Sequence, residues 1–92
     1  MRISKTTHIW NDERNIICSI DEDCKGTVVY FHLEELPEIT EDVIDYITER
    51  VMTNNATEDL ADRICIEALI KAAIENETSL EKDEYELDIR IC

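Results

Sequence analysis

The spacing of apolar residues changes twice along this 92-residue chain, and these changes constrain the fold more than any other feature. Three N-terminal runs are rich in the β-branched and aromatic side chains that favour strands: residues 2–10, 15–20 and 27–33. Two later runs, residues 41–52 and 58–75, place apolar side chains at helical spacing. Residues 85–92 return to strict alternation, so the sequence predicts the element order β-β-β-α-α-β.

This order predicts an α+β fold with two layers, in which a four-stranded, mainly antiparallel sheet carries both helices on one face. The other sheet face is expected to be polar and in contact with water, as antiparallel sheets allow. The polar segments 11–14, 21–26 and 76–84 are expected to form turns and loops. At this length the chain is expected to form a single domain over residues 1–92.

Polar residues indicate where the two helices begin. Thr40 is a good N-cap because its side chain can accept a hydrogen bond from the first turn. Ile39 could then pack against Ile44 as a hydrophobic staple. Thr57 is expected to cap the second helix in the same way.

The second helix is apolar around most of its circumference. One wide stripe consists of Leu60, Ala61, Ile64, Cys65, Ala68, Leu69 and Ala72. Further apolar residues extend that stripe: Ile66, Ile70, Ala73 and Ile74. We therefore expect this helix to be covered on two sides, with Cys65 in the core. Its open edge is expected to carry an i,i+4 ladder of Arg63, Glu67, Lys71 and Glu75.

Net charge is the unusual quantity. The chain has 23 acidic and 9 basic residues, which gives a formal net charge of −14. A small domain needs a net charge of only about 2 to 8 in magnitude for solubility. The excess repels itself and lowers stability, so solubility alone explains it poorly. Such a surface repels free DNA, RNA and anionic membranes, and attracts basic protein surfaces.

The outward side of the first helix concentrates this charge. We name it the acidic helix face, and it consists of Glu41, Asp42, Asp45 and Glu49. Like charges at i, i+3 and i+7 destabilise a helix, which indicates a purpose other than folding. The face spans roughly 12 Å at about 1.5 Å per residue, or about one charge per 4 Å, close to the roughly 3.4 Å spacing along a DNA strand. The sequence predicts a partner-binding site formed by Glu38, Glu41, Asp42, Asp45, Glu49, Glu58, Asp59 and Asp62.

No pattern indicates catalysis, a metal or a cofactor. The stretch DEDCKGTVVYFH resembles a calcium loop, but its twelfth position is His32 rather than the required Glu. Cys18 and Cys24 lack the close spacing of zinc ligands, and the acidic residues between them disfavour a reactive thiolate. A glycine-rich phosphate loop is also lacking. The chain is therefore expected to be neither an enzyme nor a metalloprotein.

The N-terminal segment has no apolar run typical of a signal peptide, and no stretch is long enough to span a membrane. These features predict a soluble intracellular protein with reduced cysteines. The polar face of the first strand is a candidate for a secondary contact, including one with bound RNA, through Arg2, Ser4, Thr6 and His8.

With acidic stretches such as TEDVIDYITE and ATEDLADR, the chain resembles the small acidic proteins by which phages and other mobile elements disarm bacterial defences. These proteins include anti-CRISPR inhibitors and nucleic-acid mimics. The resemblance implies a stoichiometric inhibitor that docks on a CRISPR–Cas effector complex and occupies basic residues meant for target DNA. The alternative is an acidic interaction module of another kind: an antitoxin, an adaptor or a small subunit that binds a different basic partner.

Overall fold

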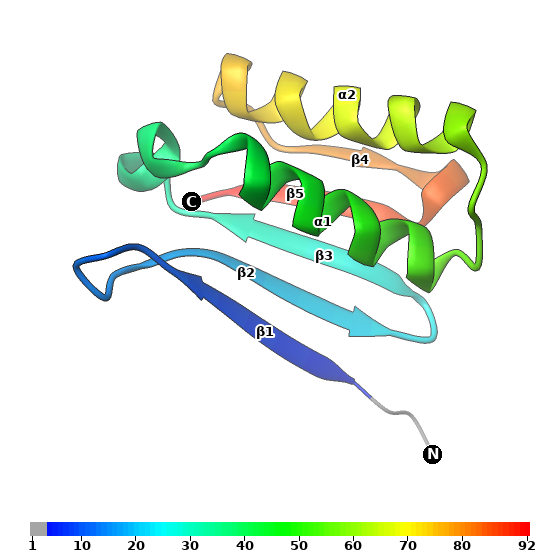
Figure 1. Ribbon diagram of the computed structural model, residues 1–92, viewed down its shortest axis with the longest axis horizontal. Helices are drawn as coiled ribbons and strands as arrows, with labels where there is room; N and C mark the ends of the chain where they lie inside the picture. The colour runs from blue at the N-terminus through cyan, green and yellow to red at the C-terminus, as the bar shows by residue number, and fades with distance from the viewer. Residues whose placement is uncertain (1–3) are drawn as a thin grey trace.

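The computed structural model describes residues 4–92 and contains an α+β fold built on a five-stranded mixed sheet (Figure 1). The strand order in the sheet is β1-β2-β3-β5-β4. The strands are β1 (Lys5–Trp10), β2 (Ile16–Asp23), β3 (Gly26–Phe31), β4 (Leu80–Lys82) and β5 (Leu87–Ile91). The α+β class is confirmed. Residues 2 and 3 of the first predicted strand lie outside the described residues.

Three neighbouring strand pairs are antiparallel, and only β3 and β5 run parallel. The sheet is therefore mainly antiparallel, as predicted, but the predicted number of four strands is wrong. The additional strand β4 lies in the segment 76–84 that was expected to be a loop. It is three residues long and has no buried side chain, so the sequence shows no hydrophobic pattern there. Only its backbone pairing with β5 makes it a strand.

Both helices, α1 (Glu41–Asn54) and α2 (Leu60–Asn76), lie on the same side of the sheet (Figure 1). Two short 3-10 helices lie in the connections: η1 (Leu33–Glu38) between β3 and α1, and η2 (Asp83–Tyr85) between β4 and β5. Tyr85, which was predicted to begin the last strand, therefore belongs to η2, and its side chain is buried.

The core lies between the helices and the sheet. Alternate side chains of β3 and β5 point into it and are fully buried, including Val29, Phe31 and Ile89. Ile47 of α1 and Ile66 of α2 are fully buried against them. Removing such side chains from water is the main stabilising contribution in a domain of this size.

The start of α1 agrees with the prediction, whereas the start of α2 does not. The Thr40 side chain accepts a hydrogen bond from the Val43 backbone N–H at 3.3 Å. At α2, the capping residue is Asp59, whose carboxylate accepts a hydrogen bond from the Ala61 N–H at 2.8 Å. Thr57 lies two residues before this cap, and its hydroxyl accepts a hydrogen bond from the Asp59 N–H.

The orientation of α2 also differs from the prediction. Its buried residues are Ile66, Ile70 and Ala73. Most of the predicted core stripe is exposed on the opposite side of the helix, and we name this exposed set the apolar α2 stripe: Leu60, Ala61, Ile64, Cys65 and Ala68. Apolar spacing could not select the buried side, because the helix is apolar around most of its circumference. In the described chain, α2 is covered on one side rather than two.

Two contacts fix α1 on the sheet. Arg50 donates from Nε and Nη2 to one carboxylate oxygen of Glu22, at 3.0 and 2.8 Å. Asn54 donates to the Thr27 hydroxyl at 2.9 Å. Because Glu22 lies on β2 and Thr27 on β3, these bonds hold the inner side of α1 and leave the acidic helix face outward.

Candidate interaction surface

The acidic helix face is confirmed as an exposed surface, because all four of its side chains lie outward on α1. Packing of Ile44, Ile47 and Val51 against the sheet fixes the opposite side. Glu41 and Asp42 lie in the first turn, where the helix dipole stabilises negative charge. Asp45 and Glu49 lie further along and gain little from that effect.

Two of the four carboxylates form ion pairs with α2. Arg63 hydrogen-bonds to Glu49, and Lys71 contacts Glu41 at 3.3 Å and Glu67 at 3.5 Å. The pKa of Arg63 is raised by its hydrogen bond to Glu49, and that of Lys71 by its hydrogen bond to Glu41. The expected ladder along α2 is therefore only partly formed, because Arg63 reaches across to α1.

Asp42 and Asp45 remain available to an external cation. Both are exposed, and no ion pair within residues 4–92 includes either one. They lie three positions apart on a helix whose backbone is held by a cap and by the core. Asp45 lies within electrostatic range of Arg63, which is already hydrogen-bonded to Glu49. This pair is therefore the part of the acidic helix face with the least internal compensation.

The other predicted site residues have different environments. Glu38 ends η1 and is exposed, and Glu58 is exposed in the connection between the helices. Asp59 is committed to capping α2. Asp62 is half-buried and accepts hydrogen bonds from the Thr57 hydroxyl at 2.8 Å and the Tyr85 hydroxyl at 3.1 Å. Asp59 and Asp62 thus support the fold as well as adding negative charge.

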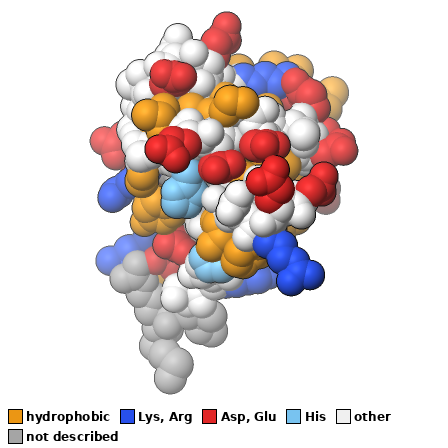
Figure 2. All heavy atoms as spheres, turned by 90° about the vertical axis from the view of Figure 1, so that its left-hand side faces the viewer, with side chains coloured by type: hydrophobic (Ala, Val, Ile, Leu, Met, Phe, Trp, Pro, Cys, Tyr) orange, Lys and Arg blue, Asp and Glu red, His pale blue; other side chains and the backbone are white. Residues whose placement is uncertain are grey.

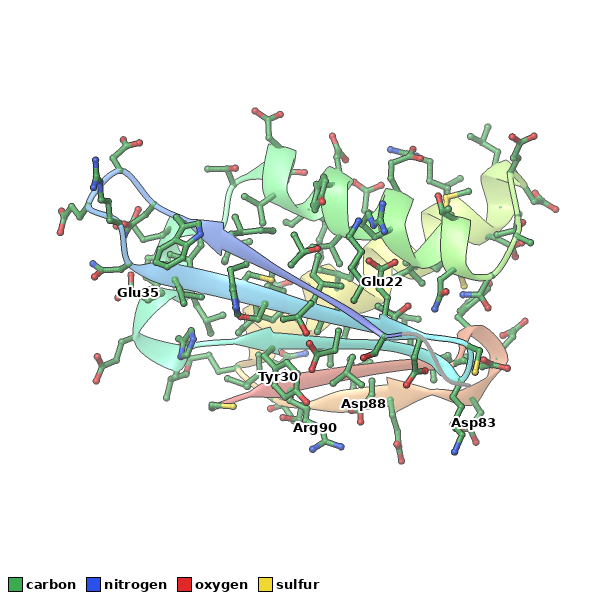
Figure 3. The ribbon with its side chains drawn as sticks, turned by 90° about the horizontal axis from the view of Figure 1, so that it is seen from below. Glu22, Tyr30, Glu35, Asp83, Asp88 and Arg90 are labelled. Atoms are coloured by element: carbon green, nitrogen blue, oxygen red, sulfur yellow. The ribbon has the colours of Figure 1, made fainter. Side chains whose placement is uncertain are left out.

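A second group of carboxylates, which sequence reasoning did not assemble, borders a shallow hollow at one end of the sheet. The hollow has a volume of about 690 Å³. Apart from Glu22, which is paired with Arg50, we name its acidic residues the sheet acidic cluster: Asp21, Asp23, Glu81, Asp83, Glu86 and Asp88. Figure 3 shows Asp88 with Tyr30 and Arg90 on the side of the sheet away from the helices, while Glu22 points toward α1.

The alternation of β2 and β5 contains part of this signal, since Asp21 pairs with Val28 and Val28 with Asp88 on the same face. Glu81 joins them only through β4, the strand that the sequence did not reveal. Several members have partners within the chain: Asp21 accepts a hydrogen bond from the Thr6 hydroxyl at 2.7 Å, Asp23 accepts one from the Lys25 N–H at 2.7 Å, and Asp88 pairs with Arg90 at 2.9 Å.

Carboxylates are therefore abundant on more than one side of the molecule. Figure 2 shows another side, on which Asp and Glu side chains gather near the centre and Lys and Arg lie mainly at the borders. The negative potential extends beyond the residues predicted from the sequence. The acidic helix face differs from the rest in being mounted on a helix held by the core.

The candidate secondary contact lies on the open face of the sheet. Ser4, Thr6 and His8 are exposed, and Arg2 lies outside the described residues. His8 Nδ1 lies 2.9 Å from the Ser19 hydroxyl, and its ring meets Trp10 edge-on with centroids 6.2 Å apart. These side chains form polar contacts within the sheet.

The four cysteines differ in burial. Cys18 is buried on β2, and burial raises the pKa of its thiol to about 12, which disfavours the thiolate. Cys24, Cys65 and Cys92 are exposed. Cys65 therefore lies on the surface, contrary to the expectation that it fills the core. Its hydrogen bond with Tyr85, together with burial and Asp62, raises the pKa of that tyrosine.

Among residues 4–92, no three His, Cys, Asp or Glu side chains converge on a position that could hold a metal ion. The stretch that resembles a calcium loop forms the hairpin between β2 and β3, where Asp23 accepts a hydrogen bond from the Lys25 N–H at 2.7 Å. In the same part of the chain, no helix combines the length and apolar character needed to cross a bilayer.

No protein-family model, curated protein or solved structure matches this chain. What the protein does must therefore be argued from its own surface.

Proposed function

We propose that this protein is a stoichiometric inhibitor that docks on a host CRISPR–Cas effector complex and blocks target DNA binding. Its acidic surface would occupy basic residues that otherwise hold nucleic acid. The observation that carries the proposal is the exposed pair Asp42 and Asp45 on a helix packed on the core, neither of which forms an ion pair within residues 4–92. Asp42 also stabilises the first turn of α1 through the helix dipole, whereas Asp45 lies further along and gains little from it.

In this proposal, the protein and the target DNA compete for the same Lys and Arg side chains of the effector. A groove that binds nucleic acid is lined with Lys and Arg, and it releases counterions when a polyanion enters. A rigid row of carboxylates at a spacing of a few ångströms offers those side chains a comparable partner. The net charge of −14 also increases the rate of association with a basic surface. Inhibition then requires only binding, with no reaction at the surface.

A DNA-binding assay with purified, guide-loaded effector complexes tests this proposal. We expect one class of effector to lose affinity for target DNA as the protein is added, with inhibition complete near one equivalent. Raised salt should weaken the inhibition, because charge pairing contributes to it. Undiminished target binding by every effector at saturating protein would reject the proposal.

The alternative function is an acidic interaction module, such as an antitoxin, an adaptor or a small subunit, that binds another basic partner. The apolar α2 stripe favours this class as well. An apolar surface packs against apolar protein side chains rather than against a basic groove that binds phosphates. A host partner that handles no nucleic acid, confirmed by reconstitution from purified components, would favour the alternative.

A further inference from the structure

The outer side of α2 is an apolar surface that no other part of residues 4–92 covers. Leu60 is 70% exposed and Ile64 is 64% exposed, more than any other large hydrophobic residue among residues 4–92. Ala61, Cys65 and Ala68 are exposed beside them. These five residues lie on consecutive turns of the same helix, so they form one continuous stripe.

Folding of the described chain does not account for this stripe. A surface helix normally has one apolar side and one polar side, whereas a helix that is apolar all round is covered on both. Ile66, Ile70 and Ala73 already supply the buried side of α2. The opposite stripe therefore has the composition of an interface rather than that of a solvated helix.

The charges beside the stripe indicate the chemistry of its partner. Glu49 and Glu41 join α1 to α2 through Arg63 and Lys71. The two basic side chains nearest the stripe are thus already used within the chain. Asp42 and Asp45 form no ion pair in the described part, although Asp45 lies within electrostatic range of Arg63. The pairing of Glu49 with Arg63 and of Glu41 with Lys71 places both aspartates near the Ala68 end of the stripe. An apolar stripe with acidic side chains at that end complements a partner whose apolar side chains are followed by Lys or Arg.

A second copy of this chain fits the stripe poorly. An antiparallel copy, stacked stripe on stripe, would bring the acidic helix faces of both copies to the same side of the contact. A parallel copy would instead bring together two helix N-termini, each carrying Glu58 and Asp59. Both arrangements place like charges close together, which favours a basic partner over self-association.

The side chains of the stripe also suit a helical partner. Ala61, Cys65 and Ala68 are small, so the axis of a second helix could approach α2 to about 8–10 Å. Leu60 and Ile64 project beyond them and could fill gaps between the partner's side chains. Helix-in-groove recognition uses such anchors, one turn apart.

We propose that the apolar α2 stripe docks a basic amphipathic helix of a partner protein. The apolar side of that helix would pack on Leu60 and Ile64, while its Lys or Arg side chains would face Asp42 and Asp45. The inference rests on the proposed function only in that both require a basic partner. The inference adds that the partner is recognised by apolar contact as well as by charge.

The test is an NMR titration of the isotope-labelled protein with two synthetic probes. One probe is an amphipathic helical peptide of leucine and lysine, and the other is polylysine with the same number of lysines. We expect the peptide, but not polylysine, to shift the methyl signals of Leu60 and Ile64. Peptide binding should persist at salt concentrations that abolish polylysine binding, because apolar contact is not screened.

Two aspartate substitutions give the test a matched pair. Ile64→Asp should weaken peptide binding by at least about tenfold, the loss expected for a central apolar anchor. Leu33→Asp changes another exposed large hydrophobic residue, on η1, and should leave peptide binding unchanged. Amide spectra check that each variant is folded, and Leu60→Asp replaces Ile64→Asp if the latter does not fold.

Three outcomes would overturn the inference. The methyl signals of the stripe could stay unshifted, both variants could lose affinity equally, or the same signals could shift with protein concentration alone, which would assign the stripe to a second copy. Failure of the proposed function is seen separately, as undiminished DNA binding by the effectors. Peptide docking on the stripe without effector inhibition would retain this inference and reject the inhibitor proposal.

Discussion

At the residue scale, the ion pair between Glu22 and Arg50 determines how the acidic helix face is presented. Glu22 is a buried carboxylate, 8% exposed, and both hydrogen bonds from Arg50 go to one of its oxygens. These bonds also raise the pKa of Arg50, with the hydrogen bond to Glu22 as the main cause. The contact joins β2 to the inner side of α1, which keeps the outer side facing solvent.

Removing this charge should therefore destabilise the fold. We expect Glu22→Gln to lower the free energy of unfolding by about 1–3 kcal/mol, since a buried charged hydrogen bond is replaced by a neutral one. Urea denaturation measures the change. Glu13→Gln, at an exposed carboxylate in the turn after β1, should leave the midpoint almost unchanged. Equal effects of the two substitutions would mean that the Glu22 contact contributes nothing specific.

Cys18 gives a second prediction, on pH. Burial raises the pKa of its thiol from 9.0 to about 12, so the folded state holds that proton more tightly than the unfolded state. The stability contribution is complete below about pH 9 and falls as the pH rises from there toward 12. At pH 8 we expect an alkylating reagent to label Cys24, Cys65 and Cys92 rapidly and Cys18 slowly, as read by mass spectrometry. Rapid labelling of Cys18 in the folded protein would contradict its burial.

At the element scale, the sequence predicted where helices and strands lie better than it predicted their contacts. Thr40 could be recognised as a cap because it directly precedes a periodic run. Whether Thr57 or Asp59 caps α2 depended on the path of the chain between the helices, which the sequence does not show. β4 was missed because an exposed edge strand of three residues needs only backbone pairing. The prediction that α2 is covered on two sides was wrong, because apolar residues occupy nearly every direction around the helix and their spacing does not select the buried side.

The orientation of α2 can be tested by stability. Ile66→Ala should lower the free energy of unfolding by about 2–4 kcal/mol, because Ile66 is fully buried. Ile64→Ala should change it by less than about 0.5 kcal/mol, because Ile64 is 64% exposed. Thermal or urea unfolding of the two variants gives the comparison. The reverse ranking would show that α2 is rotated relative to the structure described above.

At the scale of the whole molecule, negative charge surrounds the fold, and one part of it is structurally distinct. The acidic helix face was predicted from its spacing, because helical periodicity fixes which side chains share a side. The sheet acidic cluster was not, because strands far apart in the sequence bring its members together. The ion pairs of Glu41 with Lys71 and of Glu49 with Arg63 could not be predicted either, because they depend on how the two helices pack.

A charge-reversal pair locates the functional surface most directly. Asp42→Lys with Asp45→Lys changes the acidic helix face, and Glu81→Lys with Asp83→Lys makes the same change in charge within the sheet acidic cluster. The measurement is the affinity of an inhibited, guide-loaded effector for target DNA in the presence of each variant. We predict that the first variant no longer lowers that affinity, while the second inhibits almost as well as the wild-type protein. Equal inhibition by both variants, or loss of inhibition only with the second, would contradict the assignment of the acidic helix face as the site that competes with DNA.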